Sequence, residues 1–113
     1  MKISDKELIE LHTLAESAAY KATAEYVRKN PDQWYPCGFS WVRIKPARGQ
    51  LVSFLKRNGI GRTDSYGGGL IVYNPSGHST QCMEAKRLGS QAYIEIMSKH
   101  FPSVKMTAET RID

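Results

Sequence analysis

Three cations lie close together in the stretch Arg43-Ile44-Lys45-Pro46-Ala47-Arg48, and their spacing suits the binding of a phosphate group. Side chains alternate along a strand, so Arg43 and Lys45 share one face. Arg48 opens a predicted helix, whose first amide groups have no partner within the helix. We therefore predict that the three side chains converge at one edge of a sheet and bind an anion there. The alternative is three separate, solvent-exposed cations.

The run Tyr66-Gly67-Gly68-Gly69 is a second candidate ligand-binding segment. Glycines allow a backbone to approach a ligand closely, so we expect Gly68 to contact the ligand and Tyr66 to stack on a base. The run is not a P-loop, because no Gly-Lys-Ser/Thr follows and a strand comes next. The alternative is a flexible entry into that strand.

A third candidate is the connection Asn74-Pro75-Ser76-Gly77-His78-Ser79-Thr80, which joins a predicted strand to a predicted helix. Small polar side chains and free amides at a helix start hold anions well. Loops at the carboxyl ends of strands are also common ligand sites in open α/β sheets. The side chains expected to bind are Asn74, Ser76, His78, Ser79 and Thr80. The alternative is that Ser79 or Thr80 only caps the helix.

The positive charge of the chain is confined to one segment. The formal net charge is +5, yet residues 33–63 contain six Lys and Arg side chains and no acid. Such asymmetry predicts an anionic partner, either nucleic acid or a nucleotide. Interleaved aromatic residues suit single-stranded nucleic acid, although we expect core packing to occupy Phe39 and Trp41 first. The alternative is a solvated face whose charges the acids of the first helix neutralise.

No residue pattern predicts catalysis, a metal site or a cofactor. His12, His78 and His100 lack metal-ligand spacing with one another and with the cysteines. Cys37 and Cys82 do not form a C-x-x-C pair, and we expect two buried free thiols. Two cysteines, no signal-peptide core and no apolar run of membrane-spanning length predict a cytoplasmic protein that does not enter a membrane.

Hydrophobic periodicity and turn residues predict three helices and three strands. The predicted helices cover residues 5–29, 48–58 and 80–100, with Ser4 and Glu7 forming a capping box at the start of the first. The predicted strands cover residues 39–45, 70–73 and 104–107, followed by a polar tail at 109–113. Gly89 falls inside the third helix, where close approach to the sheet would compensate for its poor helix propensity.

This order predicts one α/β domain over residues 1–113, with α+β as an alternative class. Two strand-helix-strand steps favour right-handed crossovers onto a small three-stranded sheet. Exposed edges of such a sheet permit a homodimer by strand pairing.

Five segments together carry a resemblance to known proteins: Trp34–Val42, Tyr66–Gly69, the Tyr73-Asn74-Pro75 turn, Thr80–Met83 and Arg111-Ile112-Asp113. They resemble small proteins encoded by tailed bacteriophages, a group without an established activity. The resemblance implies a phage setting and assigns no residue roles. Together with the charge pattern, it suggests a phage accessory protein, for host takeover or counter-defence, that binds nucleic acid or a nucleotide without catalysis. The alternative is an inhibitor that presents the basic surface to an acidic host or defence protein.

Overall fold

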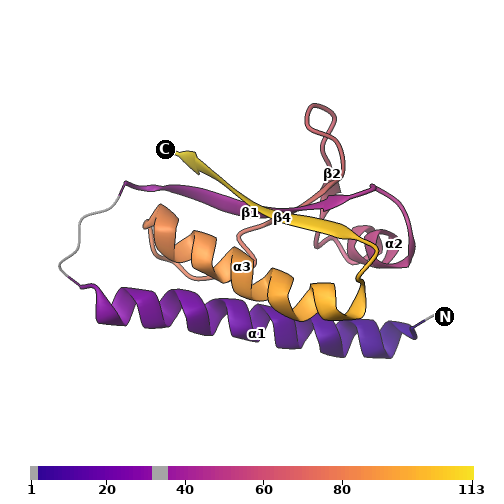
Figure 1. The fold of residues 1–113 in the computed structure, drawn as a ribbon, viewed down its shortest axis with the longest axis horizontal. Coiled ribbons are helices and arrows are strands. Elements are labelled where there is room, and N and C mark those ends of the chain that lie inside the picture. The colour runs from indigo at the N-terminus through magenta and orange to yellow at the C-terminus, as the bar shows by residue number, and fades with distance from the viewer. Residues whose placement is uncertain (1–2, 32–35) are drawn as a thin grey trace.

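The computed structural model describes residues 3–31 and 36–113. The helices are α1 (Asp5–Lys29), α2 (Gln50–Arg57) and α3 (Met83–His100). The strands are β1 (Gly38–Lys45), β2 (Arg62–Thr63), β3 (Leu70–Tyr73) and β4 (Lys105–Ile112). In Figure 1 the helices lie on one side of the sheet, with α3 between α1 and the strands. The mixed α/β class predicted from the sequence is therefore confirmed.

The first helix forms as its residues predict. The Ser4 hydroxyl accepts a hydrogen bond from the Glu7 amide at 3.2 Å, and the Glu7 carboxylate accepts one from the Ser4 amide. Leu8, Ala15 and Ala19 are fully buried on one side of the helix. Their side chains face α3, and the small residues allow the two helices to approach closely.

Gly89 of α3 packs directly against α1 and the loop after β3. A Cβ atom at this position would lie 2.9 Å from the Ser76 Cβ and 3.1 Å from the Ala19 carbonyl oxygen, and would also clash with the Thr23 hydroxyl. Glycine is thus required at position 89 by α1 and by the loop after β3, and not by the sheet as predicted.

The sheet differs from the prediction in strand number and direction. Among the described residues it has four strands in the order β2-β3-β1-β4, and every neighbouring pair is antiparallel. The predicted strand-helix-strand crossovers between parallel strands are therefore wrong. Strand β2 has two exposed residues and no apolar pattern, so only its pairing with β3 defines it. Strand β4 extends through the predicted polar tail, because its backbone pairs with β1 along all eight residues of both strands.

Two helices begin later than predicted. Residues before α3 are held by local hydrogen bonds: the His78 ring accepts from the Thr80 amide at 3.0 Å, and the Thr80 hydroxyl accepts from the Cys82 amide at 3.1 Å. Helix α3 consequently starts at Met83, with Cys82 rather than Ser79 or Thr80 as its N-cap. Helix α2 starts at Gln50, two residues after Arg48.

One hydrophobic core lies between the sheet and the helices. Its strand residues come from the inner side of β1 and β3, and α2 and α3 add large side chains; the fully buried set includes Val42, Ile44, Leu55, Leu70, Tyr93 and Met97. The Tyr93 hydroxyl and the His12 Nδ1 share a buried hydrogen bond of 2.8 Å that ties α3 to α1.

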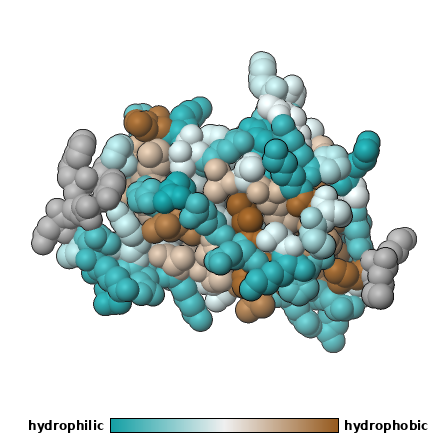
Figure 2. Space-filling view, viewed as in Figure 1, coloured by the Kyte–Doolittle hydropathy of each residue, from teal (hydrophilic) through white to brown (hydrophobic). Residues whose placement is uncertain are grey.

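The flank seen in Figure 2 carries hydrophobic residues in small, separate patches among hydrophilic ones. This flank therefore offers no broad apolar docking surface among the residues drawn in colour. No helix within residues 3–31 and 36–113 has the length and apolarity needed to cross a bilayer.

Candidate nucleic-acid interface

The side of the sheet that faces away from the helices is built by the alternation of β1. Gly38, Ser40, Val42 and Ile44 are buried toward the helices. The intervening side chains of β1 therefore point to the opposite side. These side chains are Phe39, Trp41, Arg43 and Lys45.

Register extends this surface across the neighbouring strands, because residues paired directly in an antiparallel sheet share a face. Strand β4 places Arg111 opposite Phe39, Glu109 opposite Trp41, Thr107 opposite Arg43 and Lys105 opposite Lys45. Strand β3 adds Ile71 and Tyr73, and β2 adds Arg62. We call this surface the outer face; its members are Phe39, Trp41, Arg43, Lys45, Arg62, Ile71, Tyr73, Lys105, Thr107, Glu109 and Arg111.

Aromatic rings and cations alternate on the outer face. The Phe39 and Tyr73 rings lie 6.1 Å apart between centroids, and Tyr73 is 56% exposed. The Arg111 guanidinium lies 5.4 Å from the centre of the Phe39 ring, within the range of a cation–π contact. Phe39 and Trp41 are thus half-buried residues of an open surface, and the prediction that the core would occupy them first is wrong.

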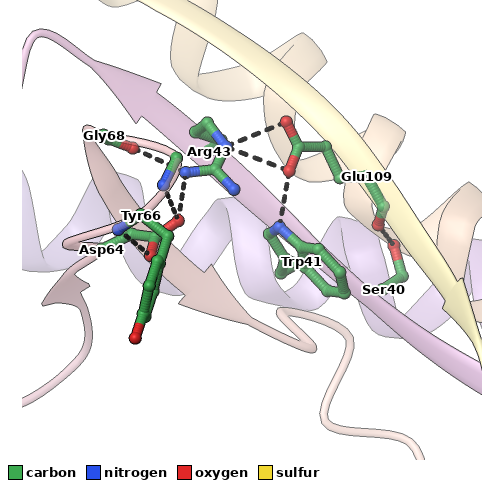
Figure 3. Close-up of polar contacts among 8 residues, drawn as sticks. Ser40, Trp41, Arg43, Asp64, Tyr66, Gly68 and Glu109 are labelled. Carbon is green, nitrogen blue, oxygen red and sulfur yellow. Dashed lines mark hydrogen bonds and ion pairs between the residues drawn. The ribbon is translucent and has the colours of Figure 1, made fainter.

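Arg43 is held in a cage of acceptors near the middle of the outer face (Figure 3). Its Nε donates to both oxygens of the Glu109 carboxylate at 3.0 and 2.9 Å. Its Nη1 donates to Asp64 at 2.7 Å and to the Gly68 carbonyl at 2.6 Å. The indole N–H of Trp41 donates to the same Glu109 carboxylate at 2.9 Å.

The charges of the cage stabilise one another. Hydrogen bonds from Arg43 lower the pKa of both Asp64 and Glu109, and the two carboxylates raise the pKa of Arg43. The Arg43 side chain is only 12% exposed. Arg43 is therefore held by acceptors of the protein itself, whereas its position in the sequence suggested a cation exposed for a phosphate.

Other cations of the outer face lie around this cage. Within the part of the chain that the structure describes, Lys45, Arg62, Lys105 and Arg111 make no ion pair. Lys45 and Lys105 line a hollow of about 170 Å³ together with Arg43, Thr107 and Glu109. The outer face as a whole, with Asp64 included, carries five cations against two carboxylates.

Arg48 does not join this hollow. It lines a separate depression of about 450 Å³ with Pro46, Phe101 and Val104 among its neighbours. The predicted convergence of three cations thus reduces to the pair Arg43 and Lys45, and the structure adds Lys105 from β4. The alternative prediction was that acids of the first helix neutralise the cations of residues 33–63. Among the described residues this holds for Arg57, which donates to Asp5 at 3.0 Å.

A second hollow of about 310 Å³ lies at the other side of the outer face. Its lining includes Ile60, Arg62, Ile71 and Tyr73. An aromatic ring and aliphatic side chains beside one cation form a surface suited to a planar, weakly polar group joined to an anion.

The β2–β3 hairpin stands beside these hollows. It projects from the sheet on the side opposite the helices (Figure 1). Tyr66 at its tip is 99% exposed, and Gly68 and Gly69 both have a φ of 78°, which favours glycine. Asp64 accepts from the Tyr66 and Gly67 amides, and the Arg43 contacts fix the base of the hairpin to the outer face.

The connection after β3 lies away from the outer face. Its polar groups bond to one another: Ser76 donates to the Asn74 side chain at 2.8 Å and accepts from the His78 amide at 3.2 Å. The His78 ring lies 5.1 Å from the Tyr20 ring of α1. Asn74, Ser76, His78, Ser79 and Thr80 therefore build a loop packed toward the helices, and the structure does not bring them together with Arg43 and Lys45.

Other candidate chemistry gains no support from the geometry. No cluster of three or more His, Cys, Asp or Glu side chains suited to a metal occurs among the described residues. A hollow of about 790 Å³ lies at the start of α1 and is lined by Asp5 and Glu7 beside Arg57, an unsuitable charge balance for an anion. Cys37 is exposed and Cys82 half-buried, so the prediction of two buried thiols is wrong. Trp34 and Tyr35 lie outside the described residues.

Sequence reasoning missed Glu109, Lys105, Arg111 and Tyr73. Each second residue of Lys105-Met106-Thr107-Ala108-Glu109-Thr110-Arg111 is polar, a period-two signal that runs from the predicted strand 104–107 into the predicted tail. The partly buried residues between them are Met106 and Ala108, which are too few to mark a strand clearly.

Comparison of the chain with protein-family models, with curated proteins and with solved structures found no match.

Proposed function

We propose that this protein binds single-stranded nucleic acid on the outer face of its sheet, without catalysis. The observation that carries the proposal is the pattern of that face: Phe39, Trp41 and Tyr73 interleave with unpaired cations on a sheet side that the helices leave open.

The physical chemistry of single strands fits such a surface. Unpaired bases expose their flat faces, and stacking on an aromatic side chain contributes roughly 1–3 kcal/mol per base. In a duplex the same faces are already stacked, so aromatic rings on a sheet discriminate against it. Cations spaced along the strands attract the phosphates irrespective of sequence.

We assign a role to each part of this surface. Tyr73 is the most exposed ring of the outer face and borders the hollow at Ile71, where a base has room to stack. Lys45 and Lys105 flank the smaller hollow, where a phosphate meets two ammonium groups. The hairpin between the two hollows forms a wall along the path of the strand, with Tyr66 at its tip as a further stacking ring.

The biological setting is part of the proposal. The resemblance to small proteins of tailed bacteriophages supports an accessory role in the cytoplasm of the host, in host takeover or counter-defence. A binding surface of this kind needs no catalytic group to sequester or protect a single strand.

The test is a binding titration with defined probes. Fluorescein-labelled oligothymidine of about 12 nucleotides, the matching RNA and a duplex of equal length are titrated with the full-length protein, and anisotropy is followed. We expect both single strands to bind more tightly than the duplex. Four unpaired cations predict a slope of log K against log salt of about −3, since each phosphate contact on a single strand contributes about −0.7.

Matched variants locate the surface. Tyr73→Ala is compared with Tyr20→Ala, because Tyr20 has a similar exposure, 50% against 56%, but lies on α1. Lys105→Ala is compared with Lys99→Ala, an exposed lysine in the last turn of α3. We expect the first member of each pair to weaken binding about tenfold or more, and the second to leave it within about twofold.

Three results would reject the proposal. The first is an affinity that does not change with salt concentration, and the second is a loss of affinity in Tyr20→Ala as large as that in Tyr73→Ala. The third is capture of a stoichiometric acidic protein from nuclease-treated host lysate with no affinity for any oligonucleotide, which would favour the inhibitor alternative.

A further inference from the structure

The two cysteines of the chain face each other across an isolated antiparallel bridge. Cys37 precedes β1 and Cys82 precedes α3, and the two residues are bridge partners. The Gly38 amide donates to the Gln81 carbonyl at 3.1 Å, and the Met83 amide donates to the Pro36 carbonyl at 3.2 Å. Because the flanking residues exchange the hydrogen bonds, Cys37 and Cys82 form a non-hydrogen-bonded pair.

This type of pair has the geometry that a disulfide requires. Partners at such a position have Cα atoms about 4.5 Å apart and side chains on the same face. A disulfide accommodates Cα separations from about 4.4 to 6.8 Å. The backbone around the pair is held on both sides, since the Cys37 carbonyl also accepts from the Asp113 amide at 3.0 Å. Little movement is needed to join the sulfurs.

Both sulfurs are also available for reaction. Neither cysteine is bonded to another group, Cys37 is exposed and Cys82 is half-buried. By alternation Cys37 lies on the same side of the sheet as Phe39, so the pair borders the outer face. An oxidant in solution has access to Cys37 first.

We propose that Cys37 and Cys82 form a reversible intramolecular disulfide by exchange with a small-molecule disulfide such as oxidised glutathione. The Cys37 thiolate attacks one sulfur of glutathione disulfide, whose S–S bond breaks and releases one glutathione thiolate. The Cys82 thiolate then attacks the Cys37 sulfur and displaces the second glutathione. The protein loses two electrons and two protons, and one glutathione disulfide becomes two glutathione thiols. This site does not depend on the proposed binding of nucleic acid.

The bond would join the first residue before β1 to the N-cap of α3. The loop closed between positions 37 and 82 contains β1, α2, β2 and β3. Closing a loop of this length restricts the unfolded chain strongly, so the folded state gains stability. We expect the thermal midpoint to rise by roughly 10 °C on oxidation.

The experiment uses the full chain equilibrated in glutathione buffers of increasing oxidised fraction, then quenched with acid and alkylated. Intact mass should show a monomer lacking two hydrogens and carrying no alkyl group at the oxidised end, and two alkyl groups at the reduced end. Added dithiothreitol should restore the reduced mass and the lower thermal midpoint.

Serine variants supply the controls. Cys37→Ser and Cys82→Ser should each end as a single glutathione adduct or a disulfide-linked dimer. The double variant should match the reduced protein in circular dichroism and thermal midpoint, and should not respond to oxidation. The proposal is overturned if the wild-type chain, with its circular dichroism unchanged, accumulates two glutathione adducts or a Cys37-linked dimer. An internal disulfide that lowers the thermal midpoint would also overturn it.

Discussion

Replacing Glu109 with glutamine separates the structural role of the Arg43 cage from the proposed binding role of the outer face. Glutamine keeps the size of the side chain and one carbonyl oxygen, which can accept from Trp41 or from Arg43. It removes one of the two carboxylates that neutralise Arg43. The variant should therefore be less stable and bind a single strand more tightly.

The stability loss follows from what remains of the cage. Asp64 still accepts from Arg43 at 2.7 Å, so the guanidinium is not left without a carboxylate. The Glu109 side chain is 35% exposed, and solvent screens part of its interaction. Loss of one charge-assisted hydrogen bond under these conditions costs about 1–2 kcal/mol. Urea denaturation monitored by tryptophan fluorescence measures the change.

The affinity gain follows from counterion release. With one carboxylate gone, the outer face can neutralise one more phosphate, which steepens the salt slope by about 0.7. Over one decade of salt concentration this corresponds to about fivefold tighter binding at the low-salt end. Oligothymidine anisotropy titrations between about 50 and 500 mM salt resolve such a difference.

Glu95→Gln is the control, because Glu95 is an exposed carboxylate of α3, on the helical side of the molecule. It changes the net charge equally and should leave the slope and the stability nearly unchanged. The reasoning is refuted if Glu109→Gln weakens binding, or if both variants change the slope by the same amount.

Three further changes probe other parts of the structure. Arg43→Lys cannot reach Glu109, Asp64 and the Gly68 carbonyl together, so amide exchange in residues 64–69 should accelerate while core amides stay protected. Gly89→Ala should destabilise the protein by about 1–3 kcal/mol in thermal or urea unfolding, despite a helix-propensity gain of about 1 kcal/mol, because the new methyl group meets Ser76 and α1. Burial lowers the pKa of His12 below its ordinary value of 6.5, against the opposing attraction of Glu16. The contribution of the neutral His12 to stability is therefore complete above pH 6.5 and is lost as the pH falls toward the folded-state pKa. His12→Gln should flatten this part of the profile of urea midpoint against pH, and an unchanged profile would contradict the assignment.

The sequence predicted the helices well because their signals are local. The capping box at Ser4 and Glu7 and the apolar spacing of residues 8–19 define α1 without reference to the rest of the chain. Strand β3 begins and ends where its turn residues predict. Strands β2 and β4 were missed or shortened because pairing with a neighbour, rather than side-chain hydrophobicity, creates them.

The candidate site could be predicted only in part for the same reason. Alternation alone places Arg43 and Lys45 on one face. Whether Arg43 is free depends on Asp64, 21 residues later, and on Glu109, 66 residues later, and no local pattern in the sequence connects these positions. In the antiparallel sheet β3 ends beside Trp41, away from Lys45 at the end of β1. The polar loop after β3 therefore lies away from Lys45 and packs near Tyr20, whereas a parallel sheet would have placed the ends of the two strands side by side.

The position of β4 at the border of the sheet has a consequence for experiments on the outer face. One side of this eight-residue strand pairs with β1, and the sheet order places no described strand on its other side. Lys105, Glu109 and Arg111 are charges that discourage a second chain from adding to such a border. Replacing several of them with alanine at once would therefore raise the risk of self-association, and loss of binding in a multiple alanine variant would report aggregation as readily as affinity. Single substitutions, or exchanges to glutamine and serine, keep the border polar and the measurement interpretable.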